Sequence, residues 1–380
     1  MVFADWPRLL FAVVVTGLVV VVVGPMLIPE RLRPRFRIWG FRIATVLLTL
    51  TISGLMFEGA LRLWGVRSYY QPRRTHWHGA RRPSEDVVPG CCLQLRPYAT
   101  FEHVYDGNPT GYFDTRNGPT WGLTYRTNRY GLRGPDFARR KAPEVTRIMI
   151  LGDSFVFGEG VRLEDTVTAR LERLLNARGG GRFQVINAAA AMWDTCCETN
   201  YLERDGVTFK PDIVMIGYVL NDATYRVGLD LWDNVTSTYQ NRRLRTSYLF
   251  SYVYGVIARN TMTRGFVQEM VAGAREHRAD WDSSLAALSR GREIAASIGA
   301  RYVVFIYPFL YELSDRYPFL DLHAMVVDHC RAHDIEVIDL FPYYKGLSAT
   351  ALWVHPSDPH PNATGHEIAA EAIAEYLSGH

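Results

Sequence analysis

The chain has 380 residues, of which 48% are hydrophobic and 21% charged, and its formal net charge is +3. This composition predicts one large folded domain with appendages and excludes a disordered chain. The small positive balance gives no reason to expect nucleic-acid binding, because much of the arginine excess lies near the N-terminus, where a membrane explanation competes. The five cysteines include two adjacent pairs but no Cys-x-x-Cys spacing. We therefore expect no zinc site, and at least one free thiol in any intramolecular disulfide scheme.

Two apolar runs near the N-terminus predict a transmembrane helical hairpin. Residues 9–28 carry no charge, and at about 1.5 Å rise per residue such a run spans a hydrocarbon core of roughly 30 Å. The second run covers residues 43–57 and reaches Leu63 if the charged residues near its end lie at the membrane interface. The first run is longer than the apolar core of a signal peptide and no small-x-small cleavage site follows it. Both helices are therefore expected to be retained.

Charge sets the expected orientation of this hairpin. The loop between the two runs carries five arginines against a single acidic residue, Glu30. By the positive-inside rule this loop is cytoplasmic, which places both termini and the main domain outside, in the periplasm or the extracellular space. Further arginines at 67–82 oppose this orientation, but they lead into a long translocated domain and are given less weight. The loop arginines are Arg31, Arg33, Arg35, Arg37 and Arg42.

Residues 65–145 form a membrane-proximal segment in which aromatic side chains alternate with Gly, Pro and Asn. This pattern predicts turns and short strands. The aromatics have two interpretations: they stack on sugar rings, or, with greater weight, they pack the segment against the main domain. His76 and His78 form a His-x-His pair, which without further ligands is usually a surface feature. The aromatics are Tyr98, Phe101, Tyr105, Tyr112, Phe113, Trp121, Tyr125 and Tyr130.

From residue 146 to 380, short apolar strands alternate with helices. Such alternation predicts an α/β domain, a three-layer α/β/α flavodoxin-like fold with a parallel sheet between helices. One interval, 223–280, is far longer than the usual connection of about 2–6 residues, and it is either a lid over a site or a structural elaboration. The expected strands are 147–151, 183–188, 213–219, 302–307 and 336–340, and the expected helices are 165–175, 195–204, 283–298, 320–332 and 363–377.

Polar side chains follow these strands at the edge of the sheet where the strands end. Ser154 closes the Gly-Asp-Ser sequence after the first strand, and Asn221 follows the third. The second strand runs into residues 187–195, while Asp358 and His360 precede the last helix. Ligands of open α/β sheets bind outside the carboxyl ends of the strands, so we expect these groups to surround one crevice.

The residue types match the needs of acyl transfer. Serine is a weak nucleophile until a base takes its proton, and His360 is the candidate base for Ser154. Asp358 is the candidate acceptor that fixes the imidazole tautomer and stabilises the imidazolium. The oxyanion requires fixed donors, for which the Ser154 N–H, the Asn221 amide and a backbone N–H near Met192 are candidates.

Neighbouring residues have structural explanations. Asp153 is expected to stabilise the turn as an acceptor, and Gly158 lets the backbone turn tightly before the next helix. Asp222, next to the candidate amide donor, is typical of a turn or helix cap when taken alone. His355 and His366 are expected to support the site or lie at the surface.

Taken together, the motifs resemble the SGNH (GDSL-type) hydrolase family over residues 147–378. A Thr-Asn-x-x-Gly-x-Arg segment at 127–133 is similar to the membrane-anchored bacterial subgroup. The motifs are Gly152-Asp153-Ser154 with Gly158 and Gly160, Gly217-x-x-x-Asn221-Asp222, and Asp358-x-His360-Pro361-Asn362.

This resemblance implies an SGNH hydrolase fold, hydrolysis of esters and thioesters, and no metal or organic cofactor. It implies that Ser154, Asp358 and His360 form a catalytic triad, with Asn221 as an oxyanion donor. Gly152, Asp153, Gly158 and Asp222 are structural residues near the site. The expected domains are two transmembrane helices at 1–64, the membrane-proximal segment at 65–145 and a hydrolase-like domain at 146–380.

Two positions depart from the family pattern. Met192 stands where the family usually has a glycine that donates its N–H, so its Cβ narrows the pocket or demands a different φ. Asp358 and His360 are two residues apart, where three is commoner, although related membrane-anchored acetylation enzymes also show two.

Three functions fit these observations. The first is a periplasmic serine esterase or deacylase that acts on an acylated, notably acetylated, glycan or lipid. The second is an O-acyltransferase that receives an acyl group from a membrane acyltransferase partner and passes it to a polysaccharide. The third is a non-catalytic glycan-binding module, which the intact triad disfavours. None of the three requires a nucleic acid.

Overall fold

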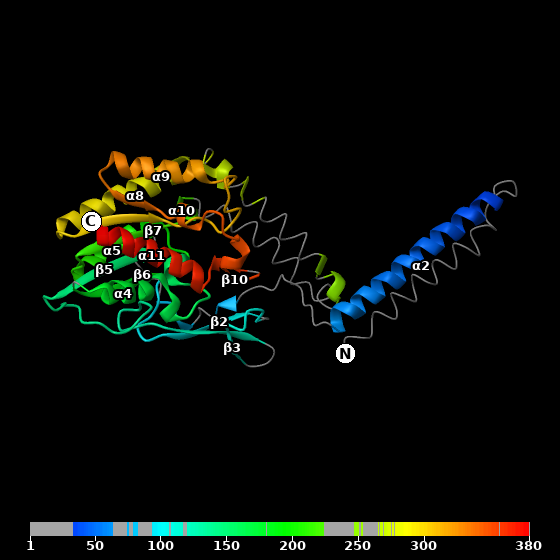
Figure 1. The fold of residues 1–380 in the computed structure, drawn as a ribbon, viewed down its shortest axis with the longest axis horizontal. Coiled ribbons are helices and arrows are strands. Elements are labelled where there is room, and N and C mark those ends of the chain that lie inside the picture. Colours follow the sequence, from blue (N-terminus) through cyan, green and yellow to red (C-terminus); the bar gives the residue numbers. More distant parts are fainter. Residues whose placement is uncertain are drawn as a thin grey trace. The chain divides into compact units, whose positions relative to one another are not determined.

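The computed structural model contains two compact units, residues Met1–Tyr70 with Val235–Asn260 and residues Gln71–Asn234 with Thr261–His380. Each unit is described by itself below, and Figure 1 shows the elements. The structure describes residues 33–63, 74–75, 79–82, 93–105, 108–116, 120–179, 181–223, 247–250, 252–253, 265, 267–268, 270–274, 276, 278–356 and 358–379.

The first unit contains the long helix α2 (Arg33–Leu63). Within the described residues, its stretch Ile38–Leu63 is the one helix long and apolar enough to cross a membrane, and few of its side chains are buried. Hydroxyls inside it, such as those of Thr45 and Thr49, donate to carbonyls four residues earlier, which satisfies them within the helix. The other predicted membrane run, 9–28, lies outside the described residues, so the hairpin stays a prediction.

The start of α2 corrects one expectation. The sequence places four arginines in a loop between two membrane helices, whereas the structure places them in the first turns of α2. They are Arg33, Arg35, Arg37 and Arg42. Arginine is a good helix former, and Pro34 falls in the first turn, where its missing N–H has no helical partner to lose. The arginines therefore extend the apolar helix at its N-terminal end.

Part of the 223–280 insertion packs on α2 in the same unit. The Glu58 carboxylate accepts hydrogen bonds from Ser247 Oγ at 3.0 Å, from Tyr248 N at 3.0 Å and from Leu249 N at 2.7 Å. Glu58 also pairs with Arg62 one turn later at 2.7 Å. This carboxylate thus satisfies backbone donors at the start of a short helical stretch, where negative charge is favourable. The interpretation of the remaining insertion as a lid stays a prediction.

In the second unit, five parallel strands of the described chain form the main sheet in the order β6-β5-β7-β8-β9. The interior strand β5, second in this order, is buried along its apolar run Ile148–Leu151, as expected for a strand covered on both faces. The strand order reverses next to β5, which confirms the predicted flavodoxin-like fold. The strands are β5 (Val145–Gly152), β6 (Arg182–Ala189), β7 (Ile213–Tyr218), β8 (Arg301–Ile306) and β9 (Glu336–Asp339).

Helices cover both faces of this sheet. The chain moves from β5 to β6 in one direction and then back across β5 to β7, so right-handed crossovers place the intervening helices on opposite faces. Helix α4 packs against α11, and α5 packs against α8. The helices are α4 (Val167–Arg178), α5 (Thr195–Arg204), α8 (Arg278–Ser297), α9 (Leu320–Ala332) and α11 (Ala363–Gly379), all in predicted positions.

The membrane-proximal segment contributes a small antiparallel sheet to the second unit. Its order is β1-β2-β4-β3, and its inward side chains join the core of the main domain. The ring of Tyr125, for example, meets that of Phe157 edge to face at 5.4 Å between centroids. This contact supports the packing interpretation of the aromatics. The strands are β1 (Arg74–Thr75), β2 (Thr100–Tyr105), β3 (Asp114–Thr115) and β4 (Trp121–Arg126).

Candidate active site

Ser154 begins the one-turn helix α3 (Ser154–Phe157) directly after β5. A side chain at Gly152 would place its Cβ 2.3 Å from Val156 Cγ2, so the tight turn requires glycine there. The carboxylate of Asp153 accepts from Phe155 N at 2.8 Å, which is the structural role predicted for it. Gly158 ends the helix with φ of +79°, a conformation that glycine adopts without strain. The sequence therefore presents the serine hydroxyl at the carboxyl end of strand β5.

A continuous chain of hydrogen bonds, the relay, joins Ser154, His360 and Asp358. Ser154 Oγ lies 2.7 Å from His360 Nε2, and His360 Nδ1 lies 2.5 Å from Asp358 Oδ1. The backbone N–H of His360 also donates to Asp358 Oδ1 at 3.2 Å. Asp358 is fully buried and His360 is 8% exposed, so both groups are largely shielded from water.

The spacing of two between Asp358 and His360 has a structural reason. Both lie on strand β11 (Asp358–Pro361), which pairs with β10 (Trp353–His355). Alternate side chains of a strand point to the same face, so residues two apart can reach each other there. This departure from the commoner spacing is therefore compatible with an intact relay.

Asn221 and Asp222 follow β7 in the one-turn helix η7 (Leu220–Ala223). β7 pairs with β5 so that Gly217 stands beside Gly152. This pairing brings the end of β7 next to the serine turn, the turn from Gly152 to Val161 that carries Ser154. Asn221 Nδ2 donates to Asp153 Oδ2 at 3.1 Å, so the predicted amide donor reaches the residue preceding Ser154.

Asp222 is one of several buried carboxyls behind this turn. It accepts from Val219 N at 3.2 Å, the turn-stabilising arrangement expected for it. Burial, and next the charge of Glu198, raise the pKa of Asp222 well above its ordinary value. Burial likewise raises the pKa of Glu198, as does nearby Asp153. The protonated forms of these acids are therefore favoured, which limits the negative charge behind the site.

Met192 follows β6 at the same edge of the sheet, since Ala189 of β6 pairs with Gly152. Its φ is +68°, in the left-handed region that favours glycine. The structure thus realises the altered backbone conformation expected of a methionine at a glycine position. The Met192 side chain is 38% exposed.

The Thr-Asn-x-x-Gly-x-Arg segment has a direct link to the serine turn. Arg133 is buried, and its guanidinium donates to the carbonyl oxygens of Phe157, Gly158 and Val161 at 2.6–2.7 Å. These carbonyls belong to the turn that follows Ser154. Arg133 therefore holds the backbone of this turn in place.

Three further residues near the relay were not assigned to the site from the sequence. The hydroxyl of Tyr105 donates to Asp358 Oδ2 at 2.7 Å. Glu159 Oε2 lies 3.9 Å from His360 Nε2, and Glu159 Oε1 lies 3.6 Å from Nδ1 of His103. Tyr105 belongs to the aromatic segment for which packing or sugar stacking was expected, and Glu159 follows the Gly-Asp-Ser motif without a pattern of its own. Their positions depend on the pairing of distant segments.

The remaining predicted histidines are supporting residues. His355 stacks on the ring of Tyr105 at 4.6 Å between centroids. His366 is fully buried, and its Nδ1 accepts from Val167 N at 3.2 Å. Burial, and next the charges of Arg133 and Arg170, lower the pKa of His366 to about 3. His366 is therefore a neutral structural residue.

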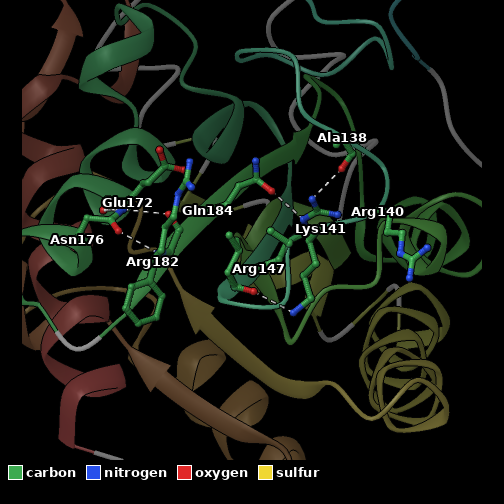
Figure 2. Close-up of a pocket in the computed structure, with 11 residues that line it drawn as sticks. Ala138, Arg140, Lys141, Arg147, Glu172, Asn176, Arg182 and Gln184 are labelled. Atoms are coloured by element: carbon green, nitrogen blue, oxygen red, sulfur yellow. Dashed lines mark hydrogen bonds between the residues drawn. The ribbon is translucent and has the colours of Figure 1, made fainter.

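Figure 2 shows a pocket at the opposite edge of the sheet, where β5 and β6 begin. Its buried cation Arg147 donates to the carbonyl oxygens of Ala138 and Arg139 at 2.8 Å. Lys141 pairs with the carboxylate of Asp212. Arg147 and Lys141 already have protein partners, and these contacts stabilise the start of the sheet. The pocket is separate from the relay.

A comparison with protein families matches residues 150–368 to the GDSL-like lipase/acylhydrolase family. The match covers more than half of the chain and includes the whole hydrogen-bonded relay. The chain belongs to this family. Family membership confirms the predicted enzyme class, a serine hydrolase that acts on ester bonds. No curated protein matches the sequence of this GDSL-like hydrolase.

Several solved structures are similar to this GDSL-like hydrolase. A two-domain esterase active on acetylated mannans is 15% identical with a TM-score of 0.39, over 62% of this chain and 49% of that one. An acetylxylan esterase from Geobacillus stearothermophilus is 16% identical with a TM-score of 0.40, over 61% and 94%. A psychrotrophic esterase from Pseudoalteromonas sp. is 13% identical with a TM-score of 0.39, over 62% and 97%. The matched part spans about half the length of the two-domain esterase.

The conformation of Met192 predicts an unusual effect of glycine. Met192→Gly should raise the free energy of unfolding by about 1 kcal/mol, because glycine adopts a positive φ without the steric cost paid by other residues. Met192→Ala is the matched control, since it shortens the side chain but keeps the Cβ. Urea unfolding measures the free energy of unfolding of wild type and both variants. A glycine variant less stable than the alanine variant would show that the backbone at Met192 is not strained.

Burial of neutral His366 predicts a loss of stability in acid. The unfolded chain binds a proton near pH 6.5, whereas the folded protein resists protonation until about pH 3, so stability falls as the pH drops between these values. His366→Asn keeps an acceptor for Val167 N and should make this slope shallower by up to about 1.4 kcal/mol per pH unit. Urea unfolding across this range tests it, with exposed His333→Asn as control. Equal slopes in wild type and His366→Asn would refute the assignment.

Proposed function

We propose that this protein is a serine esterase or deacylase that removes ester-linked acyl groups, notably acetyl groups, from an envelope glycan or lipid. The observation that carries the proposal is the continuous hydrogen-bonded relay from Ser154 through His360 to Asp358. In this proposal Ser154 is the nucleophile, His360 the general base and Asp358 the acceptor that orients the base.

The first half of the reaction forms an acyl-enzyme. His360 Nε2 takes the hydroxyl proton of Ser154 as its Oγ attacks the ester carbonyl, and Asp358 stabilises the imidazolium that results. Collapse of the tetrahedral intermediate breaks the bond to the leaving alcohol, which receives the proton from His360. In the second half, water gives a proton to His360 and attacks the acyl group. Collapse of this intermediate breaks the bond to Ser154 Oγ, which takes the proton back from His360. The products are a carboxylic acid and the regenerated serine.

The oxyanion of each intermediate requires donors beside Ser154. We assign them to the N–H of Ser154, the side-chain amide of Asn221 and the backbone N–H of Met192. An amide side chain has two N–H donors, and one of those on Asn221 goes to Asp153 at 3.1 Å. That bond fixes the plane of the amide, so the second N–H is held ready for the oxyanion. The backbone N–H of Met192 is independent of its side chain.

We further propose that the enzyme is anchored in the bacterial inner membrane with its hydrolase domain in the periplasm. The apolar surface of α2 supports membrane insertion, and the arginines in its first turns support a cytoplasmic N-terminal end. Cys197 forms a disulfide, which favours an oxidising compartment for the hydrolase domain. Among the described cysteines, Cys196 and Cys330 are free, as expected for at least one thiol.

Ser154→Ala should abolish turnover of a small acetyl ester, a loss on the order of 10⁴-fold or more, because no nucleophile remains to form the acyl-enzyme. The fold should persist, since the hydroxyl is a small part of the site. Initial rates and thermal melts of wild type, Ser154→Ala and the exposed control Ser348→Ala measure both effects. Wild-type protein that neither hydrolyses acetyl esters nor reacts with a serine-directed phosphonate would refute the esterase proposal.

Hydrolysis and acyl transfer differ in what resolves the acyl-enzyme. With an acetyl donor and a polysaccharide acceptor both present, we expect free acetate as the main product, because water resolves the intermediate in an esterase. Mass spectrometry of the polysaccharide and quantification of acetate separate the two reactions. Acetylated polysaccharide in excess of acetate would instead identify an O-acyltransferase, the function that calls for a membrane acyltransferase partner.

A further inference from the structure

We propose that Tyr105 is a positioning residue of the catalytic relay, so that the membrane-proximal segment completes the active site of the hydrolase domain. This inference rests on the proposed function, because it assigns Tyr105 a task in the same reaction. Tyr105 ends strand β2, far from the triad in sequence and outside the residues matched to the family. Its hydroxyl nevertheless donates to Asp358 Oδ2 at 2.7 Å.

The two oxygens of Asp358 have separate partners. Oδ1 accepts from His360, through the ring Nδ1 at 2.5 Å and the backbone N–H at 3.2 Å. Oδ2 accepts from Tyr105. Contacts on both oxygens prevent the carboxylate from rotating about its bond to Cβ, so Oδ1 stays aligned with the imidazole. Because Tyr105 is 1% exposed and Asp358 is fully buried, water is poorly placed to replace the phenol.

The phenol is itself held rigidly. Its ring stacks on His355 with an interplanar angle of 17° and packs against Phe113 at 4.6 Å between centroids. Space for the hydroxyl comes from the turn after Ser154, where a Cβ on Gly160 would lie 2.9 Å from the Tyr105 oxygen. The N–H of Gly160 donates to the hydroxyl of Tyr125 at 2.7 Å, which ties the same turn to strand β4. The small sheet and the serine turn therefore fit each other around the phenol.

Other titratable groups surround the relay. His103, two residues before the phenol on β2, places Nε2 3.9 Å from Asp358 Oδ2 and Nδ1 3.6 Å from Glu159 Oε1. Glu159 Oε2 in turn lies 3.9 Å from His360 Nε2. These groups and His355 are unchanged by a substitution at Tyr105, so a shift in the pH profile of a Tyr105 variant reports the lost phenol bond.

Removal of the phenol hydroxyl has a definite electrostatic consequence. A carboxylate that loses a hydrogen-bond donor keeps more charge on its oxygens and becomes a stronger base. Asp358 would then stabilise the protonated imidazole of His360 more strongly, which keeps the base protonated to higher pH. It would also rotate more freely, which lowers the fraction of molecules with an aligned relay. The first effect removes deprotonated base at the acidic end of the pH range, and the second lowers the rate of the chemical step at every pH. Neither effect touches the substrate.

Tyr105→Phe tests the inference with a small acetyl ester as substrate, in kcat and KM measured from about pH 5 to pH 9. We expect kcat to fall by roughly 10- to 100-fold with KM within about twofold, and the acidic limb of the profile to move to higher pH. Tyr98→Phe is the matched control, because the exposed hydroxyl of Tyr98 donates to Asp136 on the surface. This control should retain the wild-type profile.

Active-site titration with a serine-directed phosphonate counts the correctly folded molecules, so rates are expressed per reactive serine. A Tyr105→Phe variant that loses activity only in proportion to its titratable sites, with an unmoved acidic limb, would reduce Tyr105 to a packing residue and overturn the proposal. Equal kcat and pH profile in wild type and Tyr105→Phe would overturn it as well. Failure of the proposed function is distinguishable, because wild type and Tyr98→Phe would then also be inactive.

Discussion

The site depends on the hydrogen bond between Ser154 Oγ and His360 Nε2. This bond joins residues 206 positions apart, so the fold has to bring two distant segments together. It can form only if β5 ends at the turn that exposes the serine and if β11 returns the histidine to the same edge. The parallel sheet meets the first requirement, since its buried strand β5 leaves Ser154 at a carboxyl end. The hairpin of β10 and β11 meets the second, and the twofold period of a strand places Asp358 behind His360.

The membrane-proximal segment, residues 65–145, contacts both the turn after Ser154 and the relay. Arg133 holds the carbonyls of the turn after Ser154, and Tyr105 contacts the carboxylate of Asp358. Both side chains are buried, so their polar atoms have to be satisfied by protein groups, and those groups belong to the active-site turn and the relay. The requirement that buried polar groups find partners thus couples the small antiparallel sheet to the chemistry of a different part of the chain.

Energetic compromises gather at the strand ends beside Ser154. Met192 adopts a glycine-like φ, and buried carboxyls stand behind the serine turn. Burial raises the pKa of Asp222 and Glu198, which favours their neutral forms and limits the negative charge behind the turn at Ser154. Such local costs are tolerated where the surrounding fold over-determines the conformation, as the strand ends do here.

The sequence by itself determined the alternation of strands and helices and the flavodoxin-like class, and it predicted that Ser154, Asp358 and His360 meet at one edge of the sheet, because periodicity and motif chemistry are local properties. It misplaced the start of α2, since arginines are compatible with both a basic loop and a helix end. For the aromatic segment it indicated packing or sugar stacking, and neither interpretation includes a contact with the relay. Only the tertiary structure decided that one of those aromatics, Tyr105, meets Asp358, because the contact spans 253 positions and depends on how two sheets dock. Because both side chains are buried, the Tyr105 hydroxyl donates its hydrogen bond to Asp358 and not to water.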